Sequence, residues 1–230
     1  MINKLIISFC FFFLLFGYDL TAIEPLPKQL EEVGIVEKLN TTLPLDITFF
    51  DEDNNQVSLD ELYSNEKPAI FQLVYYTCPM LCNLVLTGFT NSLKDLDKDF
   101  FEKFNIITIS IDPSDSPESA KLFKGRYISQ LDVPDLDDKW HFLSGNQEAI
   151  TAITKAFGFN YKFNDETQEF AHSAVIFFTS KEAVISRYLY GIQFDAFDVR
   201  LAILESSNKT HLSNMEKVLL FCYNYNPQSN

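Results

Sequence analysis

The chain has 230 residues, and its 47% hydrophobic and 22% charged residues are typical of a folded globular protein. Its formal net charge is −14, from 18 Lys and Arg against 32 Asp and Glu. Binding to nucleic acid or to an anionic membrane surface requires clustered Lys and Arg, so this balance argues against both functions. It indicates a folded domain with an acidic exterior.

Residues 1–22 have the pattern of a secretory signal peptide. Lys4 precedes the apolar run 5–16, and Ala22 supplies a small residue for cleavage. The run is shorter than the ~20 residues that a membrane-spanning helix needs. An uncleaved N-terminal membrane anchor remains the alternative. Both interpretations place the rest of the chain outside the cytoplasm, and an anchor would be its only attachment to a membrane.

Residues 23–43 are polar with several prolines and are predicted to form a linker, followed by a domain over 44–206 and a tail over 207–230. Within the domain, apolar runs predict buried strands, and 3.6-residue periodicity with capping residues predicts helices. In chain order we expect a hairpin (45–50 and 56–59), a strand (69–76), a helix (80–96), a strand (104–111), a helix beginning at 116, a strand (140–143), a helix (146–157), two strands (174–179 and 185–190) and a helix (194–205). This order predicts an α/β fold, with a mixed sheet and helices on both faces.

Two cysteines, Cys78 and Cys82, stand where a buried strand ends and a helix begins. Residues four apart at a helix start share one face, so their sulfurs can bind one metal or form a disulfide. The helix N-terminus stabilises thiolates. Because ligands of open α/β sheets bind where strands end, we predict a site at this pair.

The best third ligand is His172, which directly precedes a predicted strand. Two soft sulfurs and one imidazole suit copper, Cu(I) in particular, whereas structural zinc normally takes four protein ligands. From the residues alone, a metal site, a bare redox pair and a structural cysteine pair all stay open. Cys222 lies in an apolar run and is interpreted as a buried thiol.

Six blocks of sequence make the chain recognisable: VYYTCPMLCNLVL (74–86), SIDPSDSPE (110–118), WHFLSG (140–145), FAHSA (170–174), SRYLYG (186–191) and LLFCYNYNP (219–227). Together they span most of the exported chain. On these blocks the sequence resembles the bacterial branch of the SCO/SenC family of copper-binding, thioredoxin-like proteins.

The resemblance implies a thioredoxin-like fold, with a mixed central sheet, flanking helices and an N-terminal β-hairpin. It implies copper, as Cu(I), Cu(II) or both, bound by Cys78, Cys82 and His172. The implied function is that of a copper metallochaperone with little intrinsic turnover, which assists assembly of the dinuclear copper centre of cytochrome c oxidase. The implied location is the periplasm or the outer face of the inner membrane.

The implied partner is the oxidase subunit that carries this copper centre, with a copper donor or a thioredoxin-like reductant as further candidates. The alternative function is that of an extracytoplasmic thiol-disulfide reductase. In that case Cys78 and Cys82 form a redox pair that keeps the cysteines of the oxidase subunit reduced, and His172 is dispensable.

Further residues lie near the predicted site in the sequence. Met80 lies between the cysteines and is interpreted either as a soft copper contact or as a residue packed on the sheet. Tyr75 or Tyr76 is expected to cover the metal. Many members of the family have one more residue between the Asp-Pro pair and the following acidic residue than this chain has between Asp112-Pro113 and Asp115. The resemblance therefore supports a role of Asp112 beside the site only weakly, and a turn residue is the preferred interpretation.

Overall fold

The computed structural model describes residues 32–207. The predicted signal peptide or anchor (1–22) and the tail residue Cys222 lie outside these residues. The fold is built on a five-stranded sheet with the order β11-β10-β4-β5-β6. Strands β4 (Ala69–Val74), β5 (Asn105–Ser110) and β6 (Trp140–Leu143) run parallel, β10 (Val175–Thr179) is antiparallel to β4, and β11 (Ile185–Tyr190) is antiparallel to β10. The predicted mixed sheet is confirmed.

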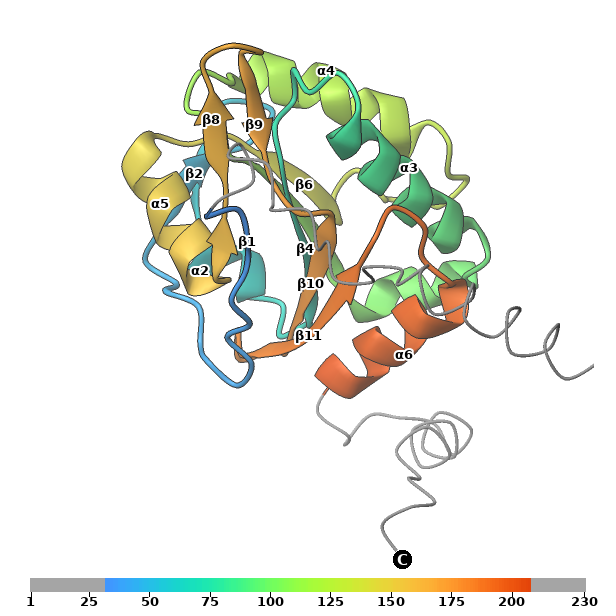
Figure 1. Cartoon of the computed structure of the whole chain (residues 1–230). Coiled ribbons are helices and arrows are strands. Elements are labelled where there is room, and N and C mark those ends of the chain that lie inside the picture. The colour runs from blue at the N-terminus through green and yellow to red at the C-terminus, as the bar shows by residue number, and fades with distance from the viewer. Residues whose placement is uncertain (1–31, 208–230) are drawn as a thin grey trace, which may run out of the picture. The chain divides into compact units, whose positions relative to one another are not determined.

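Helices cover both faces of this sheet (Figure 1). Helices α3 (Leu81–Lys94), α4 (Pro117–Ile128) and α6 (Ala196–Ser206) lie on one face, and α5 (Gln147–Ala156) lies on the other. Every residue of β4 and β5 is buried, as expected for central strands with helices on both sides. The predicted α/β layers are therefore confirmed.

Aromatic side chains fill the core on both faces of the sheet. On the α5 face, the ring of Phe157 lies 5.1 Å from Phe71 and 4.4 Å from Phe177, measured between centroids. On the other face, Trp140 of β6 contacts Phe89 of α3 and Tyr127 of α4, at 5.9 and 6.4 Å. Trp140 thus holds α3 and α4 side by side on the sheet.

Two helices begin at the positions predicted from the sequence, and a side chain caps each of them. Helix α4 starts after Ser116, whose hydroxyl accepts the Ser119 N–H at 3.2 Å, and Pro117 takes the first helical position. Helix α5 starts after Asn146, whose side-chain oxygen accepts the Ala149 N–H at 2.9 Å.

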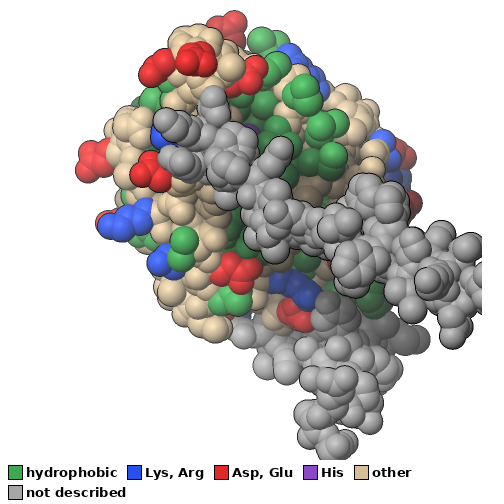
Figure 2. Space-filling view, viewed as in Figure 1, with side chains coloured by type: hydrophobic (Ala, Val, Ile, Leu, Met, Phe, Trp, Pro, Cys, Tyr) green, Lys and Arg blue, Asp and Glu red, His purple; other side chains and the backbone are tan. Residues whose placement is uncertain are grey.

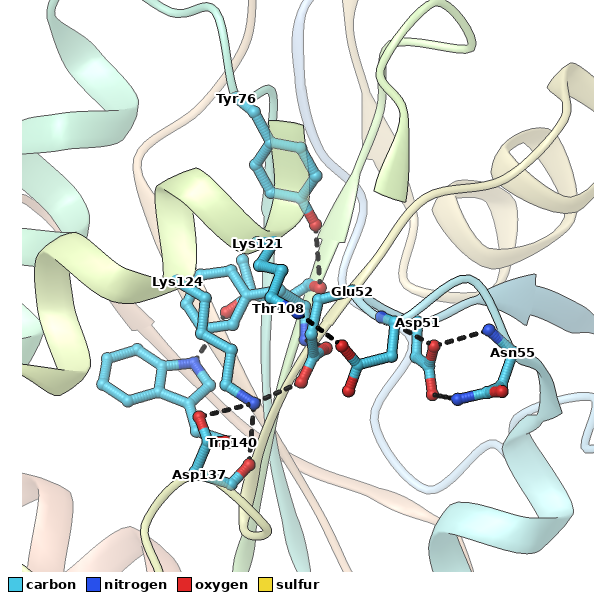
Figure 3. Close-up of polar contacts among 11 residues, drawn as sticks. Asp51, Glu52, Asn55, Tyr76, Thr108, Lys121, Lys124, Asp137 and Trp140 are labelled. Carbon is cyan, nitrogen blue, oxygen red and sulfur yellow. Dashed lines mark hydrogen bonds and ion pairs between the residues drawn. The ribbon is translucent and has the colours of Figure 1, made fainter. Parts of the chain in front are cut away.

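The predicted N-terminal hairpin consists of β2 (Thr48–Phe50) and β3 (Gln56–Ser58), followed by a short helix, α2 (Leu59–Tyr63), which was not predicted. An ion pair between Glu52 in the turn and Lys124 of α4 ties this hairpin to the domain (Figure 3). The Lys124 ammonium also donates to the Asp137 carbonyl at 2.7 Å, and Glu52 accepts the Phe142 N–H at 3.1 Å. The hairpin is therefore part of the folded unit.

Residues 32–43 differ from the expected linker because they pack on the domain. Strand β1 (Gly34–Ile35) pairs with β7 (Phe159–Asn160), and the Leu43 N–H donates to the Ala183 carbonyl at 2.9 Å. Leu43 is buried. The polar composition of this segment predicted a linker, but the apolar side chain of Leu43 is buried and backbone hydrogen bonds hold the segment on the domain.

A second hairpin, β8 (Lys162–Asn164) and β9 (Glu169–Ala171), stands apart from the central sheet, and η2 (Lys98–Lys103) is a 3-10 helix that precedes β5. Neither was predicted, because short exposed strands and single 3-10 turns carry little hydrophobic periodicity. None of the helices described for residues 32–207 is long and apolar enough to cross a membrane.

Candidate metal centre

Cys78 and Cys82 lie on either side of the point where α3 begins, shortly after the end of β4. The helix was expected from residue 80 but begins at Leu81, so Cys78 lies in the preceding loop and Cys82 in the first turn. The Cys82 N–H donates to the Cys78 sulfur at 3.3 Å. Because Met80 at the N-cap makes no side-chain hydrogen bond, this sulfur satisfies one of the free N–H groups at the helix start.

His172 reaches the cysteines from the opposite side, directly after β9. Its Nε2 lies 3.2 Å from the Cys82 sulfur, and its Nδ1 lies 3.0 Å from the Ser173 carbonyl oxygen. A carbonyl oxygen only accepts hydrogen bonds, so Nδ1 carries the proton and the Nε2 lone pair faces the sulfurs. This is the orientation that a metal-ligating histidine requires.

The three predicted site residues are therefore brought together. Their ligand atoms, two sulfurs and one imidazole nitrogen, all lie within 4.8 Å of one another. Cys82 is fully buried, whereas Cys78 and His172 are 6% and 9% exposed. Neither cysteine is in a disulfide. This donor set fits a soft metal ion such as copper, held just below the surface.

The two thiols differ in acidity. Hydrogen bonds from the Cys82 thiol, the Cys82 N–H and Tyr75 lower the pKa of Cys78 against the effect of burial. Burial, and next its bond to Cys78, raises the pKa of Cys82. The pair therefore holds one thiolate, on Cys78, and one proton, on Cys82.

Aromatic rings enclose the imidazole. The rings of Tyr75 and His172 meet edge to face with centroids 6.0 Å apart, and the ring of Phe159 lies 5.8 Å from that of His172. Tyr75 also contacts Phe170 of the β8–β9 hairpin at 5.3 Å. Tyr76, by contrast, points into the core and donates to the Leu143 carbonyl at 2.6 Å. Of the two tyrosines, Tyr75 is the one beside the site.

The buried carboxylate of Asp115 supports the loop that carries Cys78. Asp112 does not take this role and forms a turn, in which its carboxylate accepts the Ser114 N–H at 2.8 Å. Asp115 is 8% exposed and accepts the Tyr76 N–H at 2.7 Å and the Ser110 hydroxyl at 2.6 Å. Burial raises the pKa of Asp115. Asp115 was not predicted as part of the site, although it lies within the SIDPSDSPE block.

Two residues that support Cys78, Asn83 and Tyr127, were not predicted either. The Asn83 amide donates to the Cys78 carbonyl at 2.9 Å, and the Tyr127 hydroxyl donates to the Asn83 oxygen at 2.9 Å. Asn83 follows Cys82 directly, so its position was a signal that could have been used. Tyr127 comes from α4, and no local pattern connects it with the cysteines.

The surface beside the site is apolar. Met80, between the two cysteines, is 67% exposed and does not pack on the sheet. Figure 2 shows hydrophobic side chains gathered over α3 and α4. The exposed large hydrophobic residues of these helices and of the β8–β9 hairpin are Leu84, Leu122 and Phe163. A partner that approaches the buried sulfurs at the start of α3 therefore meets the exposed side chain of Met80.

Three comparisons place the chain among known proteins. The sequence model described as SCO1/SenC matches residues 38–198. No curated protein matches the chain. Among solved structures, a candidate electron transfer protein from Aquifex aeolicus VF5 is 25% identical, with a TM-score of 0.65, over 77% of this chain and 100% of that one.

Two further structures share the fold. BsSco, described as a member of the Sco family of cytochrome c oxidase assembly proteins with a disulfide switch, is 23% identical, with a TM-score of 0.60, over 75% of this chain and 96% of its own. Bradyrhizobium japonicum ScoI with copper bound is 19% identical, with a TM-score of 0.56, over 72% and 98%. These similarities confirm the thioredoxin-like fold. Since the family model covers more than half of the sequence, the chain belongs to the SCO1/SenC family.

Proposed function

We propose that the protein is a copper metallochaperone that binds one copper ion through Cys78, Cys82 and His172. It assists assembly of the dinuclear copper centre of cytochrome c oxidase. The observation that carries this proposal is the meeting of two sulfurs and one imidazole nitrogen within 4.8 Å. Membership of the SCO1/SenC family and the relative with copper bound support it.

Copper is the cargo in this proposal and leaves by ligand exchange. Incoming ligands of the partner replace the thiolates one at a time, so the site must be reachable. Cys78 and His172 retain slight exposure, whereas Cys82 is fully buried. We therefore expect Cys78 and His172 to be replaced first and Cys82 last. The copper-bearing oxidase subunit is the proposed acceptor, and the exposed apolar side chains beside the site are available for its docking.

The proposed location is extracytoplasmic, in the periplasm or at the outer face of the inner membrane. It rests on the signal-like residues 1–22. A copper donor and a thioredoxin-like reductant are proposed as further partners, because copper loading requires both cysteines in the reduced form.

Copper binding to the reduced chain tests the proposal. We expect one copper per chain by metal analysis, with two sulfurs and one nitrogen around it by X-ray absorption. His172→Ala should lose the nitrogen and weaken binding. His141→Ala, which removes a histidine of β6 outside the cluster, should bind copper as the wild type does. A wild-type chain that binds no copper tightly would overturn the proposal.

A thiol-disulfide reductase is the second candidate, and the low pKa of the Cys78 thiolate beside a protonated Cys82 favours it. In that case Cys78→Ser and Cys82→Ser each abolish oxidase assembly in cells, while His172→Ala leaves it intact. If His172→Ala also abolishes assembly, copper transfer is the function that the cell requires.

A further inference from the structure

Cys78 lies outside the helix, so separate contacts must hold it in place. Its N–H donates to the Tyr75 carbonyl at 3.2 Å, and its own carbonyl accepts the Asn83 amide at 2.9 Å. Cys82 is fixed differently, by its place in the first turn of α3 and by complete burial. Any closer approach of the two sulfurs therefore requires Cys78 to move.

Tyr127 fixes the orientation of the Asn83 amide. Its hydroxyl donates to the Asn83 oxygen at 2.9 Å, which turns the amide nitrogen toward Cys78. Tyr127 itself is 3% exposed, with its ring 5.3 Å from Phe123 and 6.4 Å from Trp140. A chain of contacts thus runs from the core under α4, through Tyr127 and Asn83, to the Cys78 carbonyl.

We propose that Asn83 and Tyr127 are positioning residues that favour the dithiol form of Cys78 and Cys82 over their disulfide. Disulfide formation removes two electrons from the pair, releases the proton of Cys82 and makes one S–S bond of about 2.05 Å. A small-molecule disulfide accepts the two electrons and becomes two thiols by taking up that proton and one more from solvent. To reach this bond length Cys78 must shift, and the shift pulls its carbonyl away from Asn83. The chain of hydrogen bonds thereby opposes oxidation and keeps the pair ready for copper.

This inference rests on the proposed function only in taking the dithiol as the form that accepts copper. Its test uses the metal-free full chain, so a failure to bind copper would overturn the proposed function and leave this result standing. The chain is equilibrated in glutathione buffers of graded potential and then alkylated. Mass spectrometry of the peptide that contains both Cys78 and Cys82 gives the reduced fraction.

Tyr127→Phe removes one hydroxyl and keeps the ring. We expect about a fivefold shift of the equilibrium toward the disulfide, the effect of one ordinary hydrogen bond, which lowers the reduction potential by ~20 mV. The matched control is Tyr63→Phe, which deletes another buried hydroxyl, bonded to Thr179 at the other end of β4. Its reduction potential should equal that of the wild type.

A double-mutant cycle separates positioning from general loosening of the fold. Asn83→Ala should shift the potential in the same direction. Because Tyr127 acts through Asn83, adding Tyr127→Phe to Asn83→Ala should cause no further shift. An unchanged potential in Tyr127→Phe would overturn the proposal. Shifts that add in the double variant would do the same.

Discussion

Cys78 and Cys82 belong to one cluster but have different chemical roles. The Cys78 sulfur accepts hydrogen bonds from the neighbouring thiol and from the helix start, whereas the Cys82 sulfur is fully buried and accepts the Tyr75 N–H at 3.4 Å. Charge therefore concentrates on the sulfur nearer to solvent. A thiolate in that place can attack an incoming disulfide or bind an incoming metal first.

The lowered pKa of Cys78 predicts its reactivity toward iodoacetamide as a function of pH. A group with a lowered pKa stays ionised as the pH falls, so alkylation of Cys78 should change little between about pH 8.5 and pH 6. A free thiol with a pKa of ~8.5 should slow by about two orders of magnitude over this range. Peptide mapping of the metal-free chain measures the rate, with N-acetylcysteine as the reference.

The prediction concerns the pH profile and not the absolute rate, because burial slows access of the reagent. Cys82, whose pKa burial raises, should be alkylated after Cys78 at every pH. A Cys78 profile that follows N-acetylcysteine, or labelling of Cys82 first, would contradict the assignment of the thiolate.

At the scale of elements, the N-terminal hairpin is attached to α4 by two ion pairs with very different surroundings (Figure 3). The side chains of Lys124 and Glu52 are 5% and 12% exposed, whereas those of Lys121 and Asp53 are 66% and 61% exposed. Water screens the second pair but not the first. Only the buried pair should therefore contribute strongly to stability.

Lys124→Met tests this difference, since it leaves the Glu52 carboxylate buried without its cation. We expect a loss of ~3 kcal/mol in the free energy of unfolding, measured by urea denaturation. Lys121→Met is the matched control on the same helix and should change little. Adding Glu52→Gln to Lys124→Met should recover part of the loss. Equal effects of the two single variants would refute the distinction.

At the scale of the whole molecule, copper binding should be coupled to the stability of the fold. The ligands come from the loop before α3, from α3 itself and from the segment after β9, so only the folded chain brings them together. A ligand that binds only the folded state stabilises it in proportion to the logarithm of its concentration.

We therefore expect Cu(I) to raise the Tm of the reduced chain. At a free concentration a hundredfold above Kd the stabilisation should be about 2.7 kcal/mol. The oxidised chain offers no thiolate and serves as the control, and His172→Ala should show a smaller rise. Differential scanning calorimetry under anaerobic conditions measures the effect. An equal rise in the reduced and oxidised chains would indicate binding elsewhere.

Much of the fold follows from local patterns in the sequence. The runs that became β4 and β5 are buried at every position, and continuous apolar runs mark such strands. Ser116 and Asn146 predicted the starts of α4 and α5 because their side chains cap N–H groups within three residues. The elements that were missed, such as β1 and the β8–β9 hairpin, are too short to show a period.

The residues of the candidate site likewise fall into those that the sequence predicts and those that it does not. Cys78 and Cys82 are four residues apart, so the order of strand and helix in the sequence was enough to predict a shared site. His172 is 90 residues from Cys82, and the sequence offered it as the best third ligand because it directly precedes a predicted strand. Only the resemblance of its block to a family motif favoured a metal site over the other interpretations of the cysteine pair. Tyr127 is 44 residues from Asn83, and Lys124 is 72 residues from Glu52. Hydrogen bonds across such separations depend on how α4 packs against the sheet, and that packing exists only in the folded chain.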